Sequence, residues 1–250
     1  MKPHYYFTLA MTLAGVANAA TIAANFSGRA NNADPGATPD QLLVQAGTSA
    51  GAAAGVNGTT TFTDVTANYN GVGGDGPTTI SGTEGSSADI IYSSQGTWSK
   101  TATGSRTVAA EDASGDMTDG HIEGNSTNGI FVTLDAINLV GTYDLYVYLG
   151  DDAGNRSGSI TVDGVTRTYT SQIFNGTFVD ASAGGGMAGD YMVFSGLTGT
   201  TQTIEMGGID NPNRTGLYGF ELIGTAPIPE PSSTALLGLG GLALLMRRKK

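Results

Sequence analysis

The chain has 250 residues, 39 glycines, no cysteine and a formal net charge of −11. The lack of cysteine excludes disulfides, thiolate catalysis and cysteine-based zinc sites. All 22 acidic residues lie between Asp34 and Glu230, so the body of the chain is strongly acidic. This negative charge excludes nucleic acid as a partner, because proteins bind nucleic-acid phosphates through clustered Lys and Arg. A hydrophobic fraction of 39% is enough for a buried core, and the length favours one domain.

Residues 1–19 have the pattern of a signal peptide. Lys2 gives a positive start, an apolar run follows over residues 5–16, and Ala17-Asn18-Ala19 supplies the small residues that signal peptidase recognises. The sequence predicts an N-terminal signal helix, cleavage before Ala20 and export. The alternative is a buried N-terminal helix, but the segment that follows offers no helix to pack against it.

Short alternating segments separated by Gly, Asn, Asp and Ser fill residues 20–226. The expected strands are TIAANF (21–26), GIFVTLDAI (129–137), TYDLYVYL (142–149), SITVDGVTRTYT (159–170), DYMVFSGL (190–197), TQTIEMGGI (201–209) and GLYGFELIG (216–224). Many short strands without strand–helix alternation predict an all-β fold, a single antiparallel jelly-roll-like β-sandwich. Residues 46–87 are poor in large apolar side chains, so we expect long loops there.

The sequence predicts the turn residues of one β-hairpin. Asp163-Gly164 lies between two β-rich arms, and a type I′ turn needs positive φ at both of its central positions. The sequence therefore predicts a tight turn at residues 163–164.

Aromatic side chains are the candidates for sugar binding. Tyr146 and Tyr148 share one face of their strand, so one sheet surface can present a tyrosine pair to the C–H face of a pyranose ring. The alternative is that another element covers this face. Trp98, the only tryptophan, is either a core anchor or a binding residue at a loop tip.

Acidic segments are the candidates for calcium, which takes six to eight oxygen ligands. They are EDASGDMTDG (111–120), with Asp112, Asp116 and Asp119, and GDDAGNRSG (150–158), with Asp151 and Asp152. The alternative is that both are acidic surface loops, since neither has the spacing of an EF-hand. We expect no other cofactor.

Catalytic patterns are missing from the sequence. His121 is the only histidine left after signal removal, we expect it in a loop, and no GxSxG motif accompanies it. Asp151-Asp152 is more typical of a solvated turn than of the two separated carboxylates that glycan hydrolysis needs. The sequence therefore predicts that the protein is not an enzyme.

The C-terminal segment, residues 227–250, differs from the body. Its prolines predict an extended spacer, and the apolar run 232–246 that follows would span only ~22 Å as a helix, against the ~30 Å core of a bilayer. The bases Arg247, Arg248, Lys249 and Lys250 would hold that end in the cytoplasm. A short transmembrane helix of this kind predicts a temporary hold in the membrane.

Pro229-Glu230-Pro231, the short apolar run and the terminal bases resemble the PEP-CTERM sorting signal. The resemblance implies that exosortase, a membrane-embedded transpeptidase-like cysteine protease, cuts near the motif while the inner membrane holds the precursor. It also implies a Gram-negative host that makes exopolysaccharide, with a role in biofilm or floc matrix. The body, at YDLYVYLGDDAGNRSGSITVDG (143–164), is similar to Gly/Thr-rich β-sandwich modules of other PEP-CTERM proteins, some of which resemble carbohydrate-binding modules.

The sequence thus predicts an exported, non-catalytic protein of the cell surface or exopolysaccharide matrix. The alternative is a lectin-like carbohydrate-binding module, with or without calcium. A glycan-cleaving enzyme is a distant third.

Overall fold

The computed structural model describes residues 18–27, 55–57, 62–66, 77–99, 120–150, 154–172, 177–209 and 214–227. These residues form strands and one 3-10 turn, η2 (Thr83–Gly85). The strands are β1 (Ala19–Ser27), β2 (Thr63–Thr66), β3 (Thr78–Ser81), β4 (Ser87–Ser93), β5 (Gly96–Ser99), β6 (Gly120–Asn125), β7 (Ile130–Asp135), β8 (Val140–Leu149), β9 (Ser157–Val162), β10 (Val165–Ser171), β11 (Met187–Gly189), β12 (Tyr191–Leu197), β13 (Gln202–Gly208) and β14 (Arg214–Thr225). Residues 1–17 of the predicted signal segment and the predicted short transmembrane helix lie outside the described residues. The last residue of that segment, Ala19, is the first residue of β1 instead of part of a helix.

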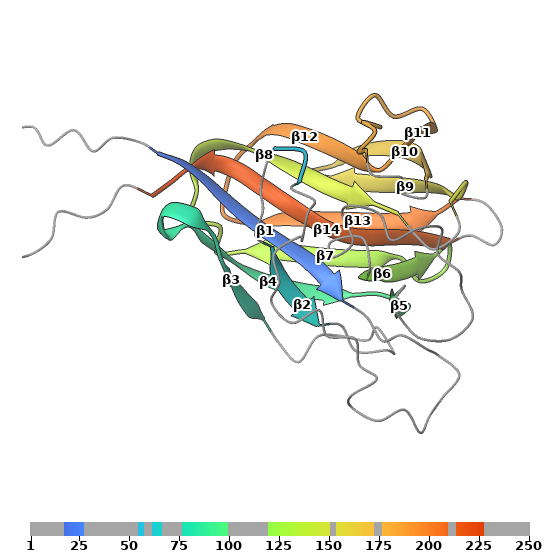
Figure 1. The fold of residues 1–250 in the computed structure, drawn as a ribbon, viewed down its shortest axis with the longest axis horizontal. Coiled ribbons are helices and arrows are strands. Elements are labelled where there is room, and N and C mark those ends of the chain that lie inside the picture. The colour runs from blue at the N-terminus through green and yellow to red at the C-terminus, as the bar shows by residue number, and fades with distance from the viewer. Residues whose placement is uncertain are drawn as a thin grey trace, which may run out of the picture.

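The strands form two sheets packed face to face (Figure 1). Sheet A has the order β12-β8-β14-β1-β2, with β6 also paired to β14 and β5 paired to β6. Sheet B has the order β11-β10-β9-β13-β7-β4-β3. The predicted all-β sandwich is confirmed, and its pairs are antiparallel except β1 with β2 and β10 with β11. The expected long loop over residues 46–87 is interrupted by β2, by β3 and by the start of β4.

The core lies between the sheets because each strand turns its apolar side chains inward at every second position. In β7, Ile130, Val132 and Leu134 are completely buried, while the residues between them face outward. In β8, Leu145 and Val147 do the same from the opposite sheet. Burial of such side chains stabilises the fold by about 1.5–3 kcal/mol each.

The hairpin between β9 and β10 has the geometry that the sequence predicts. Asp163 has a φ of 47° and Gly164 a φ of 73°, and Val165 pairs with Val162 across the turn. Both central residues are left-handed, as a type I′ turn requires.

The two ends of the described body lie side by side. β1 and β14 are antiparallel neighbours with Ala19 opposite Thr225, and the Ala226 amide donates to the Asn18 carbonyl at 2.8 Å. In Figure 1, β1 begins and β14 ends at the same edge of the molecule. The C-terminal segment therefore leaves the sandwich next to the place where β1 starts.

Candidate functional site

A groove of about 650 Å³ lies on the outer face of sheet B. Strand register builds its floor: Phe131 of β7 is flanked by Ser93 of β4 on one side and by Glu205 of β13 on the other. Thr161 of β9 continues the same row beyond Glu205. Phe131 is 48% exposed although it stands in the middle of a sheet, so its ring is open to solvent.

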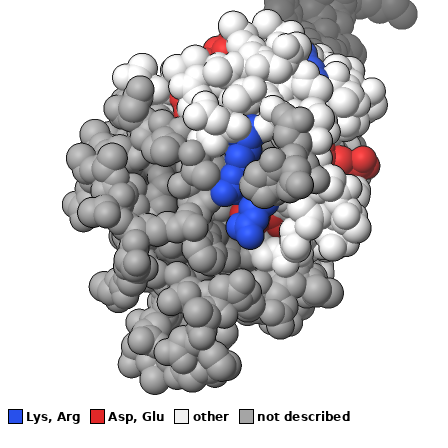
Figure 2. All heavy atoms as spheres, turned by 90° about the vertical axis from the view of Figure 1, so that its right-hand side faces the viewer, with Lys and Arg blue, Asp and Glu red and all other residues white. Residues whose placement is uncertain are grey.

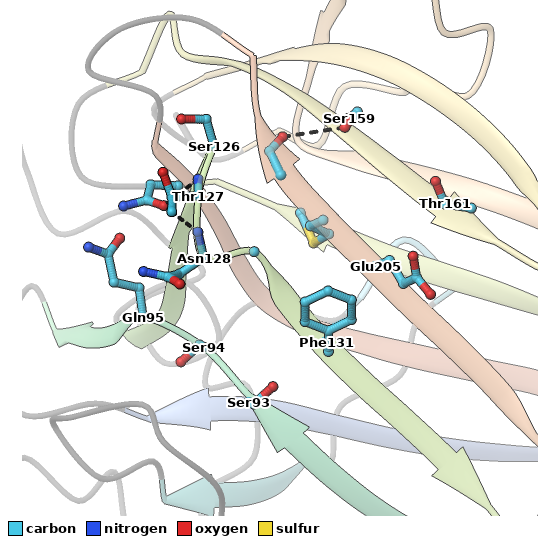
Figure 3. A pocket seen from close by; sticks show the side chains of 14 residues that line it. Ser93, Ser94, Gln95, Ser126, Thr127, Asn128, Phe131, Ser159, Thr161 and Glu205 are labelled. Carbon is cyan, nitrogen blue, oxygen red and sulfur yellow. Dashed lines mark hydrogen bonds between the residues drawn. The ribbon is translucent and has the colours of Figure 1, made fainter.

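The β6–β7 turn closes one end of this groove. The Asn125 side chain folds the turn by accepting from the amides of Thr127, at 2.8 Å, and Asn128, at 2.6 Å. The Gln95 amide donates to the Glu123 carbonyl at 2.8 Å, which fixes the β4–β5 connection beside the turn. Figure 3 shows Gln95 and Asn128 on one side of Phe131, and Glu205 and Thr161 on the other.

The groove is hollow partly because Gly207 carries no side chain. It occupies the outward position of β13 next to Glu205, and a Cβ placed there would meet only the Ser159 hydroxyl, at 3.9 Å. The space above Gly207 is therefore open, and the Ser159 hydroxyl, which donates to the Gly207 carbonyl at 3.5 Å, borders it.

This lining combines one exposed aromatic ring with hydroxyl, amide and carboxylate groups. An aromatic ring offers a flat apolar surface, while amides and hydroxyls donate and accept hydrogen bonds. The described residues of this lining include no Lys, Arg or His. Its chemistry suits an uncharged polar ligand with a flat apolar face better than an anion.

A second set of aromatic side chains covers the outer face of sheet A. It is a small separate core of buried Ala23, Phe62, Tyr148 and Tyr218, with partly buried Val56, Tyr146, Phe178 and Tyr191 packed against it.

This cover changes the expectation for the predicted tyrosine pair. Tyr148 is completely buried: its ring contacts Phe62 and Phe178, and its hydroxyl accepts from the Val56 amide at 3.0 Å. Its ring therefore has no free face for a sugar. Tyr146 keeps partial exposure and stacks on Tyr191, with ring centroids 6.4 Å apart.

Glu221 lies beneath the same cover and is fully buried. The Asn57 side-chain amide donates to its Oε2 at 3.0 Å. Burial raises the pKa of the Tyr148 hydroxyl well above its usual value, and the neighbouring negative charge of Glu221 raises that pKa further. These groups bind the 55–57 segment to sheet A and are a structural feature of the fold.

The other predicted site residues are placed as follows. Trp98 lies in β5, with its backbone opposite His121, and its side chain is outside the described residues. His121 is fully buried on β6, with its ring edge-on to Tyr218, instead of lying in a loop. The five calcium candidates, Asp112, Asp116, Asp119, Asp151 and Asp152, lie outside the described residues, as do Pro229, Glu230, Pro231 and the terminal bases.

Within the described ranges, no three His, Cys, Asp or Glu side chains come together in a group that could hold a metal ion. The same residues include no helix that is long and apolar enough to cross a bilayer. The predicted calcium loops and transmembrane helix are therefore untested.

The sequence expectations missed the groove. Phe131 carried a usable signal, because it is an aromatic residue on the polar face of an alternating strand. Glu205 and Gly207 carried none, since their position beside Phe131 depends on the pairing of β13 with β7.

Comparison with known proteins bears on the other end of the chain. Residues 227–250 match the model of the PEP-CTERM protein-sorting motif. The chain carries a PEP-CTERM sorting signal. This confirms the resemblance based on Pro229-Glu230-Pro231, and it implies an exported protein that the membrane holds until exosortase processes it.

No curated protein matches the chain in sequence. Among solved structures, the CBM35 from Cellvibrio japonicus Abf62 is 14% identical with a TM-score of 0.28, covering 42% of this chain and 74% of that one. A CBM36-1 domain of a multidomain xylanase from the hindgut metagenome of Trinervitermes trinervoides is 18% identical with a TM-score of 0.25, covering 43% and 79%. An exo-beta-1,3-galactanase from Phanerochaete chrysosporium is 14% identical with a TM-score of 0.26, covering 53% and 32%. These similarities are too loose to transfer a binding site or an activity.

Proposed function

We propose that this PEP-CTERM protein is an exported, non-catalytic component of the cell surface or exopolysaccharide matrix, and that it binds polysaccharide in the groove on sheet B. One observation carries the proposal: Phe131 is 48% exposed in the floor of an open groove bordered by amide and hydroxyl side chains. A pyranose ring has an apolar C–H face and a polar rim, which complement an aromatic ring surrounded by hydrogen-bonding groups.

The surface around the groove extends this match. Thr161 and Thr166 continue the row of Phe131 across β9 and β10, and their hydroxyl oxygens lie 2.8 Å apart. A sheet face of this kind offers repeated hydroxyl groups along a line, which suits an extended chain better than a compact ligand.

The position of the groove also supports a role at the surface. The turn that closes it begins at Asn125, which pairs with Arg214, the first residue of β14. The sorting signal follows the other end of β14, whose 12 residues span about 40 Å at the usual strand rise. A body held through its C-terminal segment would therefore present the groove away from the membrane.

The non-catalytic role is supported by the groove's lining. Glycoside hydrolysis usually employs two carboxyl groups on either side of the scissile bond. Among the described residues that line this groove, Glu205 is the one carboxylate. A binding surface accounts for this arrangement more simply than an active site.

The second candidate is a passive matrix component without a defined sugar site. A related alternative is a protein that binds sugar elsewhere, through Tyr146 and Trp98 or through the calcium loops. Tyr146 retains partial exposure beside Tyr191 on the face opposite the groove. The test below separates these possibilities.

The test is co-sedimentation of the exported protein with purified exopolysaccharide from the organism that makes it. We expect saturable binding that Phe131→Ala weakens about tenfold or more, as truncation of an aromatic binding residue commonly does. Val165→Ala is the matched control, because Val165 is an equally exposed apolar residue, at 50%, outside the groove. EDTA in a parallel series reports on calcium.

Three results would contradict polysaccharide binding in the groove. An equal loss in both variants would indicate non-specific contacts, and a loss only with EDTA would point to the acidic loops. The third is the absence of any binding, which would leave the passive matrix role.

A further inference from the structure

An acidic side chain lies next to the aromatic ring in the groove. Glu205 lies beside Phe131 on the next strand, so a ring stacked on Phe131 would hold its substituents next to this carboxylate. Beyond Thr161 along the same face, the groove gives way to a smaller hollow lined by Asp163 as well as Glu205. The charged side chains among the described residues that line these two hollows are therefore acidic.

The described part of the chain has three arginines, and none of them lines either hollow. Each makes polar contacts of its own, two of them with Glu123 of β6. Arg214 and Arg156 donate to Glu123 at 2.9 and 3.5 Å, and Arg167 donates to the Val193 carbonyl at 2.7 Å while its guanidinium lies 4.6 Å from the Phe194 ring centroid. Figure 2 shows basic and acidic side chains next to each other at the end of the sandwich seen there.

We infer that Glu205 is a specificity-determining residue, which selects polysaccharide units carrying a free amino group over uncharged units and rejects uronic acids. This inference rests on the proposed function of the groove. A protonated sugar amine would form a charge-assisted hydrogen bond with the Glu205 carboxylate while its ring stacks on Phe131. A uronic acid would place a second carboxylate beside that of Glu205, and the described residues that line the groove include no base to pair with it.

The inference is tested with three oligosaccharide probes: hexamers of glucosamine, of N-acetylglucosamine and of galacturonic acid. The first two share a backbone and differ in whether the nitrogen can carry a proton. Dissociation constants are measured by fluorescence anisotropy for the exported protein at about pH 6, where a sugar amine is protonated. We expect the glucosamine hexamer to bind about tenfold more tightly than the N-acetylated one, and galacturonate to bind most weakly.

Glu205→Gln keeps the shape of the side chain and removes its charge. It should reduce the tenfold preference to about twofold or less. The matched control is Glu84→Gln, which changes the net charge equally but lies in η2, next to the start of β1 and away from the groove. This variant should keep the preference, because general attraction between an acidic protein and a cationic sugar does not depend on one position.

Phe131→Ala separates failure of the inference from failure of the proposed function. If the N-acetylated hexamer binds through Phe131 but Glu205→Gln and Glu84→Gln behave alike, the groove binds sugar and the role of Glu205 is wrong. Tightest binding of galacturonate would also overturn it. If no hexamer and no exopolysaccharide binds, both proposals fail.

Discussion

At the scale of single residues, the clearest consequence concerns the Tyr148 hydroxyl. Burial and the charge of Glu221 raise the pKa of this group, whose ordinary value is 10.0. The folded protein therefore holds Tyr148 protonated at a pH where the unfolded chain ionises. Its contribution to stability is fully present below pH 10.0 and is lost as the pH rises above that value, because only the unfolded state releases the proton.

We expect the free energy of unfolding to fall steeply above about pH 10, and Tyr148→Phe to flatten that fall. At neutral pH the same variant should be less stable by about 0.5–1.5 kcal/mol, since the Val56 amide loses its acceptor. Urea unfolding between about pH 7 and 11 measures both effects. Tyr191→Phe is the comparison: burial raises the pKa of Tyr191 as well, but Tyr191 is only partly buried in the same cluster, so this variant should flatten the fall less than Tyr148→Phe does. If the free energy of unfolding falls equally above about pH 10 in the wild type and in Tyr148→Phe, the raised pKa of Tyr148 is not the cause of the fall.

At the scale of elements, β14 organises sheet A because it pairs with β8 along one edge and with β1 and β6 along the other. Gly216 allows this close approach. A Cβ at that position would lie 2.0 Å from the Gly150 carbonyl oxygen, a backbone atom that cannot move aside cheaply. The amide of Gly150 donates to the Gly216 carbonyl at 3.1 Å, so the same contact ties β14 to the end of β8.

Gly216→Ala should therefore destabilise the protein by about 1–3 kcal/mol, the usual cost of overpacking. Gly207→Ala is the matched control, since a Cβ there has its nearest neighbour at 3.9 Å. That variant should be neutral or more stable by up to about 1 kcal/mol, because alanine loses less conformational entropy in a strand than glycine does. Denaturant midpoints of the two variants decide the matter, and equal losses would show that β14 does not need the glycine for close packing.

The sequence predicts where individual strands and turns lie better than it predicts which residues pack beside them. Alternation within TYDLYVYL correctly separates buried Leu145 and Val147 from the opposite face, and Asp163-Gly164 predicts its own turn, because both signals are local. The alternative that another element covers the face of Tyr148 is correct, but the covering residues were not predictable, since Phe62 and Phe178 are distant in the chain. The groove was hidden for the same reason: Ser93, Phe131 and Glu205 meet only through the order of strands in sheet B.

At the scale of the whole molecule, the described sandwich and the sorting signal are separate parts of the chain. The signal was predictable in full because a processing enzyme reads a linear stretch, so its information lies in consecutive residues. The sandwich joins it at one end, where Ala20 of β1 lies opposite Gly224 of β14, and the groove is at the opposite end of β14. If the body stays attached through its C-terminal segment, as proposed, the groove would lie at the end of β14 that is far from the attachment.

This separation makes processing testable without any knowledge of the ligand. In the producing organism, the C-terminal peptide of protein recovered from the cell surface should end upstream of Lys250, near Pro229-Glu230-Pro231, because exosortase acts at the motif matched by residues 227–250. The triple variant P229A/E230A/P231A should retain the peptide that ends at Lys250 and should accumulate with the inner membrane. Ser233→Ala, which changes the same tail but keeps the motif, should be processed normally. Mass spectrometry of the C-terminal peptide distinguishes these outcomes. Surface protein that still ends at Lys250 would mean that the tail is a permanent anchor, and that the orientation argued above is set by membrane insertion instead of sorting.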